Sequence, residues 1–186
     1  LSRMNLYDDQ PLLIVGCGPI GALSAVASAV TSNRKLLVSD INQDRQSLVA
    51  ELANAQPVSL KEFDQFQNLT RQVIRNALDT TGNTGVISQL ISQMTGSKIC
   101  LVGIGAGKIE LDPVELVEKE NSLLGVHAFK DELKQAVELL AKYPDQFSRV
   151  IGPYISLEAT PASYAQLSKG QSSGIKTMIE IPREHS

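Results

Sequence analysis

The chain has 186 residues, with 17 basic and 20 acidic side chains and a formal net charge of −3. This length predicts one domain, or one domain with a fragment of another, which can bury a core without disulfides or metals. The mildly acidic balance, without a basic run, argues against nucleic acid or an anionic membrane as the main partner. Two cysteines (Cys17, Cys100) and two histidines (His127, His185) exclude a disulfide framework and leave too few soft ligands for a four-coordinate zinc site.

Neither a membrane span nor a secretory leader is visible in the sequence. The longest apolar stretch, around residues 11 to 30, is broken by glycines and a proline, and it falls short of the roughly 18 unbroken apolar residues of a spanning helix. No charged start followed by an apolar segment and a small-residue cleavage site is present. We therefore expect a soluble, cytoplasmic protein without membrane contact.

Short apolar runs alternate with helical patterns along the chain. In chain order, the patterns predict a strand at 12–15, a helix at 19–31, a strand at 36–39, helices at 43–55 and 84–94, a strand at 99–102, and helices from 112, at 130–142 and from 160 to 170. Residues 58–76 read as a short helix or an irregular connection. Strands that alternate with helices in this way indicate an α/β fold with an open, doubly wound parallel sheet.

A glycine elbow, Gly16-Cys17-Gly18-Pro19-Ile20-Gly21, lies between the first strand and the first helix. In the pattern G-x-G-x-x-G, the first glycine permits a tight turn, the second lets a pyrophosphate approach the backbone, and the third permits close helix–strand packing. The helix N-terminus adds free N–H groups and a partial positive charge. Pro19 falls at the first helical position, where its missing N–H costs nothing.

Asp40 ends the second strand 19 residues after Gly21. A carboxylate there accepts hydrogen bonds from ribose hydroxyls and repels a 2′-phosphate, which favours NAD over NADP. The alternative is that Asp40 only caps the following helix. A second glycine cluster at 103–107 reads as a flexible exit from a strand, at the carboxyl ends where ligands bind in such sheets.

These motifs resemble the medium-chain dehydrogenase/reductase superfamily, especially its zinc-type alcohol and polyol dehydrogenases. The resemblance rests on VGCGPIG followed by LLVSDINQDR, and on LDTTGN, KICLVGI, ELDPVELVEKENSLLGV and LSKGQSSGIKTMIEI, which occur in the family's order over nearly the whole chain. It implies a Rossmann fold, NAD as cofactor, and an alcohol or polyol as the substrate of the full-length enzyme.

The resemblance also implies roles for the matched positions. The pyrophosphate would be cradled by Gly16, Gly18, Pro19, Ile20 and Gly21, the adenosine ribose would be held by Asp40 with Ile41 beside it, and the adenine would lie near Arg45. The nicotinamide side would be lined by Thr81, Gly82, Val102, Gly103 and Ile104, and its carboxamide would contact Val126 and His127. Lys176 would approach the phosphates or ribose. For Lys176, an exposed solubilising lysine is an equal alternative. None of these residues is expected to be catalytic.

Two departures from the family pattern appear. The segment 73–78 carries Arg75 and Asn76 where the family has an apolar strand, so either the strand is shorter or a helix runs into it. The catalytic zinc ligands of the family lie in a preceding domain, and no matching motif occurs here. Together with the start at Leu1, this predicts a fragment that binds NAD without turning over substrate. Residues 1–150 would be the NAD-binding domain and 151–186 a return segment of the missing catalytic domain.

The resemblance further implies a homodimer formed by edge pairing of strands near 99 to 126. Three alternatives remain open. A methyltransferase that uses S-adenosylmethionine usually carries an acid where Ile14 stands, and an NAD-sensing regulatory domain leaves the segments at 110–126 and 167–181 unexplained. A zinc-free, NADPH-using quinone reductase of the same superfamily is disfavoured by Asp40.

Overall fold

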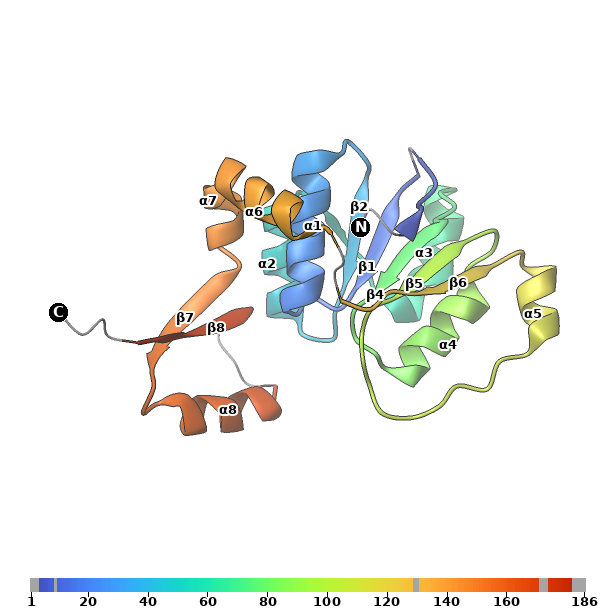
Figure 1. Cartoon of the computed structure of the whole chain (residues 1–186). Coiled ribbons are helices and arrows are strands. Elements are labelled where there is room, and N and C mark those ends of the chain that lie inside the picture. The colour runs from blue at the N-terminus through green and yellow to red at the C-terminus, as the bar shows by residue number, and fades with distance from the viewer. Residues whose placement is uncertain (1–3, 9, 129–130, 171–173, 182–186) are drawn as a thin grey trace.

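Six parallel strands form the central sheet in the computed structural model, which describes residues 4–8, 10–128, 131–170 and 174–181. The strand order is β3-β2-β1-β4-β5-β6 (Figure 1). Their bounds are β1 Leu12–Val15, β2 Leu36–Ser39, β3 Gln56–Pro57, β4 Asn76–Asp79, β5 Lys98–Leu101 and β6 Ser122–Gly125. Successive strands are added on one side of β1 up to β3, and on its other side from β4 to β6, so the strand order reverses between β1 and β4. This reversal confirms the predicted doubly wound α/β fold.

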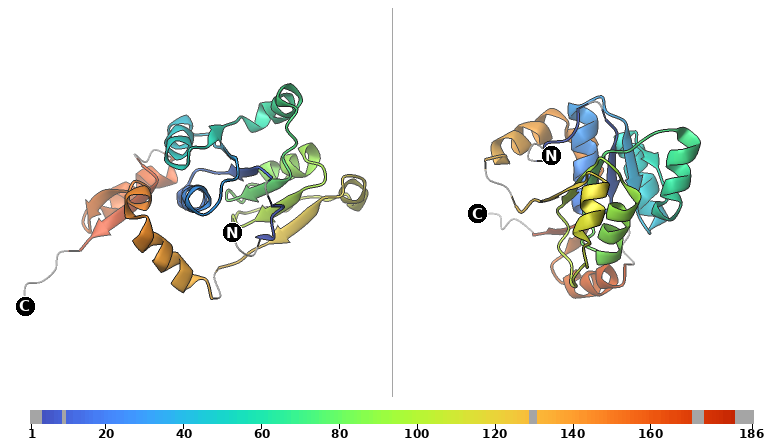
Figure 2. Two further views of the ribbon diagram at one scale, coloured as in Figure 1. Left: turned by 90° about the horizontal axis from the view of Figure 1, so that it is seen from above. Right: turned by 90° about the vertical axis from the view of Figure 1, so that its right-hand side faces the viewer.

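Helices cover both faces of this sheet, as the right-hand view of Figure 2 shows for α1 and α3. One buried cluster joins Leu12 and Ile14 to α1 and α2, and the other joins Leu13 and Val15 to α3 and α4. Successive side chains of a strand point to opposite faces, so a strand that is covered on both faces is mainly apolar. The bounds are α1 Pro19–Thr31, α2 Gln43–Ala53, α3 Phe63–Thr70, α4 Thr84–Gln93 and α5 Pro113–Glu118.

The segment between α2 and β4 contains a short helix, one of the two predicted possibilities. A 3₁₀ turn, η2 (Leu60–Glu62), leads into α3, whose Phe63 is fully buried and stacks on Phe66 with ring centroids 6.3 Å apart. The two-residue strand β3 was not predicted. It is fixed beside β2 by Gln46, whose side-chain amide donates to the carbonyls of Val38 and Val58 at 2.9 and 2.8 Å.

The strand β4 begins at Asn76, and α3 ends well before it at Thr70, so the helix does not run into the strand. Arg75 precedes the strand and is exposed, whereas Asn76 opens it and is fully buried. The Asn76 side chain accepts a hydrogen bond from the Tyr7 N–H at 2.9 Å and donates one to the Tyr7 carbonyl at 3.1 Å. The Lys98 ammonium lies 4.2 Å from the centre of the Tyr7 ring. These contacts hold residues 4–8 against the amino edge of the sheet.

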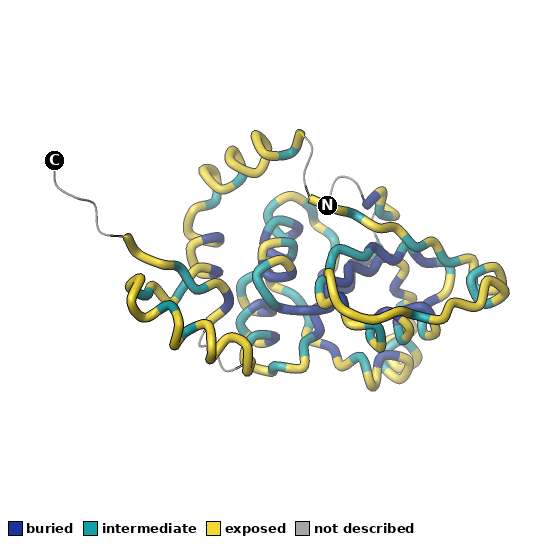
Figure 3. Tube along the Cα trace, turned by 60° about the horizontal axis from the view of Figure 1, so that its bottom comes forward, coloured by how far each residue is buried: buried dark blue, intermediate teal, exposed yellow. Residues whose placement is uncertain are grey.

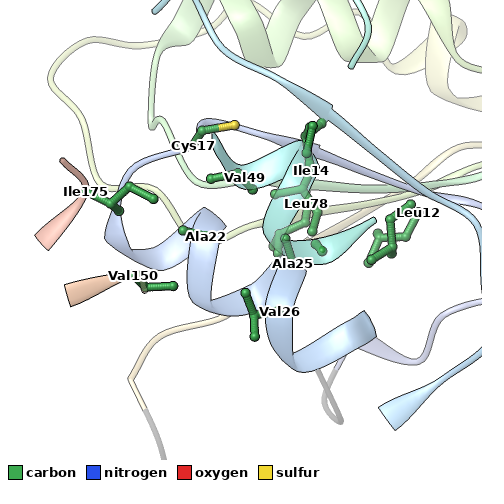
Figure 4. Close-up of a cluster of buried hydrophobic side chains, with 14 of the residues drawn as sticks. Leu12, Ile14, Cys17, Ala22, Ala25, Val26, Val49, Leu78, Val150 and Ile175 are labelled. Carbon is green, nitrogen blue, oxygen red and sulfur yellow. The ribbon is translucent and has the colours of Figure 1, made fainter. Parts of the chain in front are cut away.

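The C-terminal part forms a second, smaller sheet. This sheet follows α6 (Leu133–Lys142) and α7 (Pro144–Ser148) in the chain. Its strands β7 (Ile151–Ser156) and β8 (Lys176–Glu180) pair in parallel, and α8 (Thr160–Ser168) lies between them in sequence. The predicted start of α6 at Lys130 lies outside the described residues. Figure 4 shows Val150 and Ile175 beside Ala22, and all three belong to the cluster around α1.

Burial differs between the two parts of the chain. Buried residues concentrate in the strands of the central sheet and in α1, whereas α6, β7 and α8 are mainly exposed (Figure 3). Large apolar side chains of the second sheet and its helix are among the exposed ones, including Tyr154, Leu157, Tyr164, Ile179 and Ile181. Within the described ranges, no helix combines the length and the apolar character needed to cross a bilayer.

We expect Asn76→Ala to lower the free energy of unfolding by about 1–3 kcal/mol, because the chain loses the hydrogen bonds that the buried Asn76 side chain makes with the Tyr7 N–H and carbonyl. Urea denaturation followed by circular dichroism measures this change. The neighbouring exposed Arg75→Ala is the matched control and should stay within about 0.5 kcal/mol of the unmodified chain. Equal effects of the two substitutions would contradict the role given to Asn76.

Candidate functional site

The glycine elbow joins β1 to α1 through two positions that exclude a side chain. Gly16 has a φ of +97°, and a Cβ there would stand 2.5 Å from the Thr80 hydroxyl oxygen. A Cβ on Gly21 would stand 1.8 Å from the carbonyl oxygen of Gly16. The start of α1 therefore lies directly against the end of β1, and the third glycine has the packing role that the pattern predicts.

Gly18 differs from the other two glycines of the elbow. Its φ is −71°, and a Cβ there would meet nothing within 4 Å. The fold itself does not require glycine at this position. The space in front of Gly18 opens onto the N-terminus of α1, where Pro19 is the first helical residue and no side chain caps the helix. Such a helix end can accept an anionic group that approaches the backbone closely.

Asp40 connects the end of β2 to the elbow. One carboxylate oxygen accepts the Cys17 N–H at 2.6 Å, and the other accepts the Asn42 N–H at 2.7 Å. The alternative reading of Asp40 as a helix cap is wrong, because the N-cap of α2 is Asn42, whose side chain accepts the Arg45 N–H at 3.0 Å. A carboxylate has about four acceptor positions, so Asp40 retains capacity for further donors.

The residues around Asp40 define a charged and partly exposed rim. Ile41 is fully exposed, and Arg45 is half-buried in the first turn of α2. Burial first, and then the negative charge of Asp40, raise the pKa of the Cys17 thiol, and with the opposing effect of Arg45 included the pKa is about 12. Cys17 is therefore a protonated thiol at neutral pH and is not a nucleophile.

The turn after β4 is organised by Asp79, a residue that the sequence analysis did not single out. Its side chain is fully buried and accepts hydrogen bonds from the Thr81 N–H at 3.1 Å, the Thr81 hydroxyl at 2.6 Å and the Gly82 N–H at 3.0 Å. The Thr80 hydroxyl bonds to the Val15 and Gly16 carbonyls at 3.0 and 3.1 Å. A signal was available: an acid closes an apolar strand directly before T-T-G, where it can bond to the N–H two residues on.

The second glycine cluster packs against this turn. A Cβ on Gly103 would stand 2.1 Å from the Gly82 nitrogen, and one on Gly105 would stand 2.0 Å from the Gly82 carbonyl oxygen. Gly82 itself has a φ of +64°. These glycines therefore allow two loops to touch backbone to backbone, in place of the flexible exit that the sequence suggested.

The remaining predicted residues occupy three places. Val102 and the exposed Ile104 follow β5 in the loop that packs on Gly82. Val126 and the exposed His127 follow β6, and the Val126 N–H bonds to the Leu101 carbonyl at 3.0 Å. Lys176 is exposed at the start of β8 in the other sheet. The structure thus brings the elbow, Asp40, the turn at 80–82 and the loop at 102–105 to one end of the central sheet, and it places Lys176 in the second sheet.

Other features of the surface lie away from this end. A depression of about 390 Å³ is lined by residues of α3, of α4 and of the segments that follow these helices, including Gln67 and Gln93. Another of about 410 Å³ is lined by Asn5 and Arg34 among others. Neither is at the carboxyl ends of the strands. Among the described residues, no group of three or more His, Cys, Asp or Glu side chains could hold a metal ion.

The fold and the loops define a class of protein. A parallel sheet whose strand order reverses between β1 and β4, with a glycine elbow at the reversal and an acid directly after β2, is a Rossmann-type fold.

The curated proteins to which the chain is similar include dehydrogenases. The chain is 28% identical over 131 residues to L-threonine 3-dehydrogenase of Francisella philomiragia, covering 63% of this chain and 37% of that protein. It is 25% identical over 147 residues to sorbitol dehydrogenase of Arabidopsis thaliana, covering 74% and 40%. The chain spans less than half the length of these curated relatives. No family model matches it.

Solved structures with the same fold include alcohol dehydrogenases. Benzyl alcohol dehydrogenase from Acinetobacter calcoaceticus superimposes with a TM-score of 0.82 at 18% identity, over 96% of this chain and 51% of that one. A short chain alcohol dehydrogenase from E. coli CFT073, complexed with NADH, gives a TM-score of 0.81 at 13% identity, over 96% and 53%. The predicted resemblance to the cofactor-binding domain of the medium-chain dehydrogenase/reductase superfamily is confirmed.

We expect Gly18 and Gly21 to respond differently to alanine. Gly21→Ala should lower the free energy of unfolding by about 3 kcal/mol or more, because its Cβ would overlap the Gly16 carbonyl. Gly18→Ala should stay within about 1 kcal/mol, because its Cβ enters open space. Thermal and urea unfolding of both variants measures the difference. A Gly18 variant as unstable as the Gly21 variant would contradict the open space at Gly18.

The Cys17 thiol should make stability fall at alkaline pH. Its pKa is raised from 9.0 to about 12 in the folded chain, so the folded state holds the proton more tightly and this contribution is complete below pH 9. It is lost as the pH rises from 9 to 12, at up to about 1.4 kcal/mol per pH unit. Urea unfolding at a pH of about 8 and about 10 should show the chain losing about 1 kcal/mol more than Cys17→Ala. Parallel losses would show that Cys17 is not the cause.

Proposed function

We propose that this chain is the NAD(H)-binding domain of a zinc-dependent alcohol or polyol dehydrogenase, an enzyme that transfers a hydride between an alcohol and NAD⁺. The observation that carries the proposal is the contact between Asp40 and the glycine elbow at the strand-order reversal. It puts an acid with spare acceptor positions next to an uncapped helix N-terminus, which is the arrangement that a dinucleotide requires.

In this proposal, the adenosine and the nicotinamide of the cofactor lie over different halves of the sheet, with the pyrophosphate between them. Gly16, Gly18, Pro19, Ile20 and Gly21 would hold the pyrophosphate, since the open space at Gly18 admits phosphate oxygens to the backbone. Asp40, Ile41 and Arg45 lie on the β2 side and would hold the adenosine. The nicotinamide side would be faced by residues that follow β4, β5 and β6, namely Thr81, Gly82, Val102, Gly103, Ile104, Val126 and His127. Lys176 would approach the cofactor from the second sheet.

The carboxylate of Asp40 favours NAD(H) over the phosphorylated cofactor. Its oxygens would accept hydrogen bonds from the ribose hydroxyls and would repel a 2′-phosphate. The NADH-complexed structure with the same fold supports this choice. When bound, NAD⁺ supplies the hydride acceptor, whereas the residues of this chain bind the cofactor and orient it.

The zinc, the alcohol and the second subunit belong to the full-length enzyme in this proposal. The zinc ligands would lie in a catalytic domain, of which residues 151–186 form the return segment and residues 1–150 the cofactor domain. The exposed apolar side chains of β7, α8 and β8 support a contact with further protein there. The edge strand β6, with Leu124 exposed, supports a homodimer formed by edge pairing. This chain alone would bind NADH without turnover.

We expect NADH to stabilise the chain against thermal unfolding. A ligand at a hundred times its Kd stabilises the folded state by about 2.7 kcal/mol, and differential scanning fluorimetry reports this as a rise in Tm. S-adenosylmethionine is the control and should leave the Tm unchanged. A rise with S-adenosylmethionine and none with NADH would favour a methyltransferase and sink the proposal.

We also expect Asp40→Ala to weaken NADH binding about tenfold or more, because hydrogen bonds to a charged group are lost. NADPH binding should change less, because the loss of a repulsive charge offsets the loss of the Cys17 N–H bond. Isothermal titration calorimetry with both cofactors measures the two changes. Equal weakening of both would show that Asp40 acts only by holding the elbow and does not select the cofactor.

A further inference from the structure

The carboxylate of Asp79 is fully buried, and the roles assigned above to the cofactor-binding residues do not use it. It lies at the last position of β4 and accepts three hydrogen bonds from the next turn, two of them from backbone N–H groups and one from the Thr81 hydroxyl. Three donors converge on one side chain, so the conformation of Thr81 and Gly82 is set by Asp79.

The backbone of the same residue holds the neighbouring loop. The Asp79 carbonyl accepts the Val102 N–H at 2.9 Å and the Gly103 N–H at 3.1 Å. Gly103 and Gly105 then pack against the Gly82 backbone. Both loops on the β4–β5 side of the site therefore depend on Asp79, the first through its side chain and the second through its carbonyl.

Asp79 and Asp40 have similar roles on the two sides of the strand-order reversal. Asp79 is the last residue of β4, Asp40 directly follows β2, and each carboxylate accepts backbone N–H groups from a loop at the carboxyl edge. Asp40 remains partly exposed beside open space, whereas Asp79 is closed off from solvent. An exposed acid can bind a ligand directly, but a buried acid acts only through the groups that it holds.

We propose that Asp79 is a positioning residue for the nicotinamide half of the dinucleotide. The inference rests on the proposed function, since it assigns the β4–β5 side to the nicotinamide. Asp79 holds Thr81 and Gly82 in the conformation that receives this half, so binding does not have to order the turn. The adenosine half, which lies over β1 and β2, does not depend on Asp79.

The chemistry requires a carboxylate and not merely a polar side chain of this shape. All three partners of Asp79 are donors in the observed arrangement. Asparagine has one acceptor oxygen and one donor NH₂ group, so in either orientation it sets a donor against a donor. Asp79→Asn therefore loosens the turn while it preserves the volume of the side chain.

The test compares NADH with ADP-ribose, which lacks the nicotinamide ring, by isothermal titration calorimetry on the whole chain. The unmodified chain should bind NADH more tightly than ADP-ribose. Asp79→Asn should reduce this preference about tenfold and leave the ADP-ribose affinity within about twofold. Asn76→Ala is the matched control, because Asn76 is the buried polar residue at the opposite end of β4. It should lower stability and leave the preference unchanged.

Four outcomes would overturn the assignment. Equal weakening of NADH and ADP-ribose by Asp79→Asn would show that Asp79 only supports the fold in general. An unchanged preference for NADH in this variant would show that Asp79 does not position the nicotinamide side. An unmodified chain that binds both ligands equally would show that the nicotinamide side adds no affinity. An unmodified chain that binds neither would sink the proposed function itself. If Asp79→Asn does not fold, Thr81→Val removes one of the three donors, and it should give the same selective loss of NADH preference.

Discussion

The contact of backbone with backbone at the carboxyl edge of the sheet is the constraint on which the candidate site depends. Gly21 touches the Gly16 carbonyl, and Gly103 and Gly105 touch the Gly82 backbone, so that a single Cβ at Gly21, Gly103 or Gly105 would overlap main-chain atoms. Packed side chains in a core can shift to relieve such an overlap, but main-chain atoms of two ordered loops cannot do so cheaply. The elbow and the loops after β4 and β5 are therefore held in one arrangement before any ligand arrives.

Loops that approach so closely leave backbone N–H groups in need of acceptors. Two acids supply them: Asp40 accepts from Cys17 and Asn42 on one side of the strand-order reversal, and Asp79 accepts from Thr81 and Gly82 on the other. Unpaired buried N–H groups are costly, so both acids are explained structurally before any ligand is considered. The difference in their exposure is what separates a residue that can bind a ligand from one that positions others.

Local sequence patterns were sufficient to predict those parts of the structure whose conformation is determined by one short segment. The elbow, Asp40, and the bounds of β1, α1 and β2 follow from apolar runs, glycine spacing and the proline at the helix start. The burial of Asp79 and the packing of Gly103 could not be predicted in this way, because both depend on β4 and β5 being neighbours in space. The two-residue β3 carries no periodicity, and the place of Lys176 depends on a sheet formed by distant segments.

Amide chemical-shift mapping by NMR shows directly whether a dinucleotide lies across the carboxyl edge of the sheet, at the reversal of strand order between β1 and β4. NADH added to the ¹⁵N-labelled chain should shift the amides of the elbow, of Asp40 and Ile41, and of the turn at 81–82 and the loop at 103–104. The amides of residues 4–8, at the opposite edge of the sheet, should not move. Shifts confined to the depression beside Gln67 and Gln93, or to β7 and β8, would show that NADH binds elsewhere.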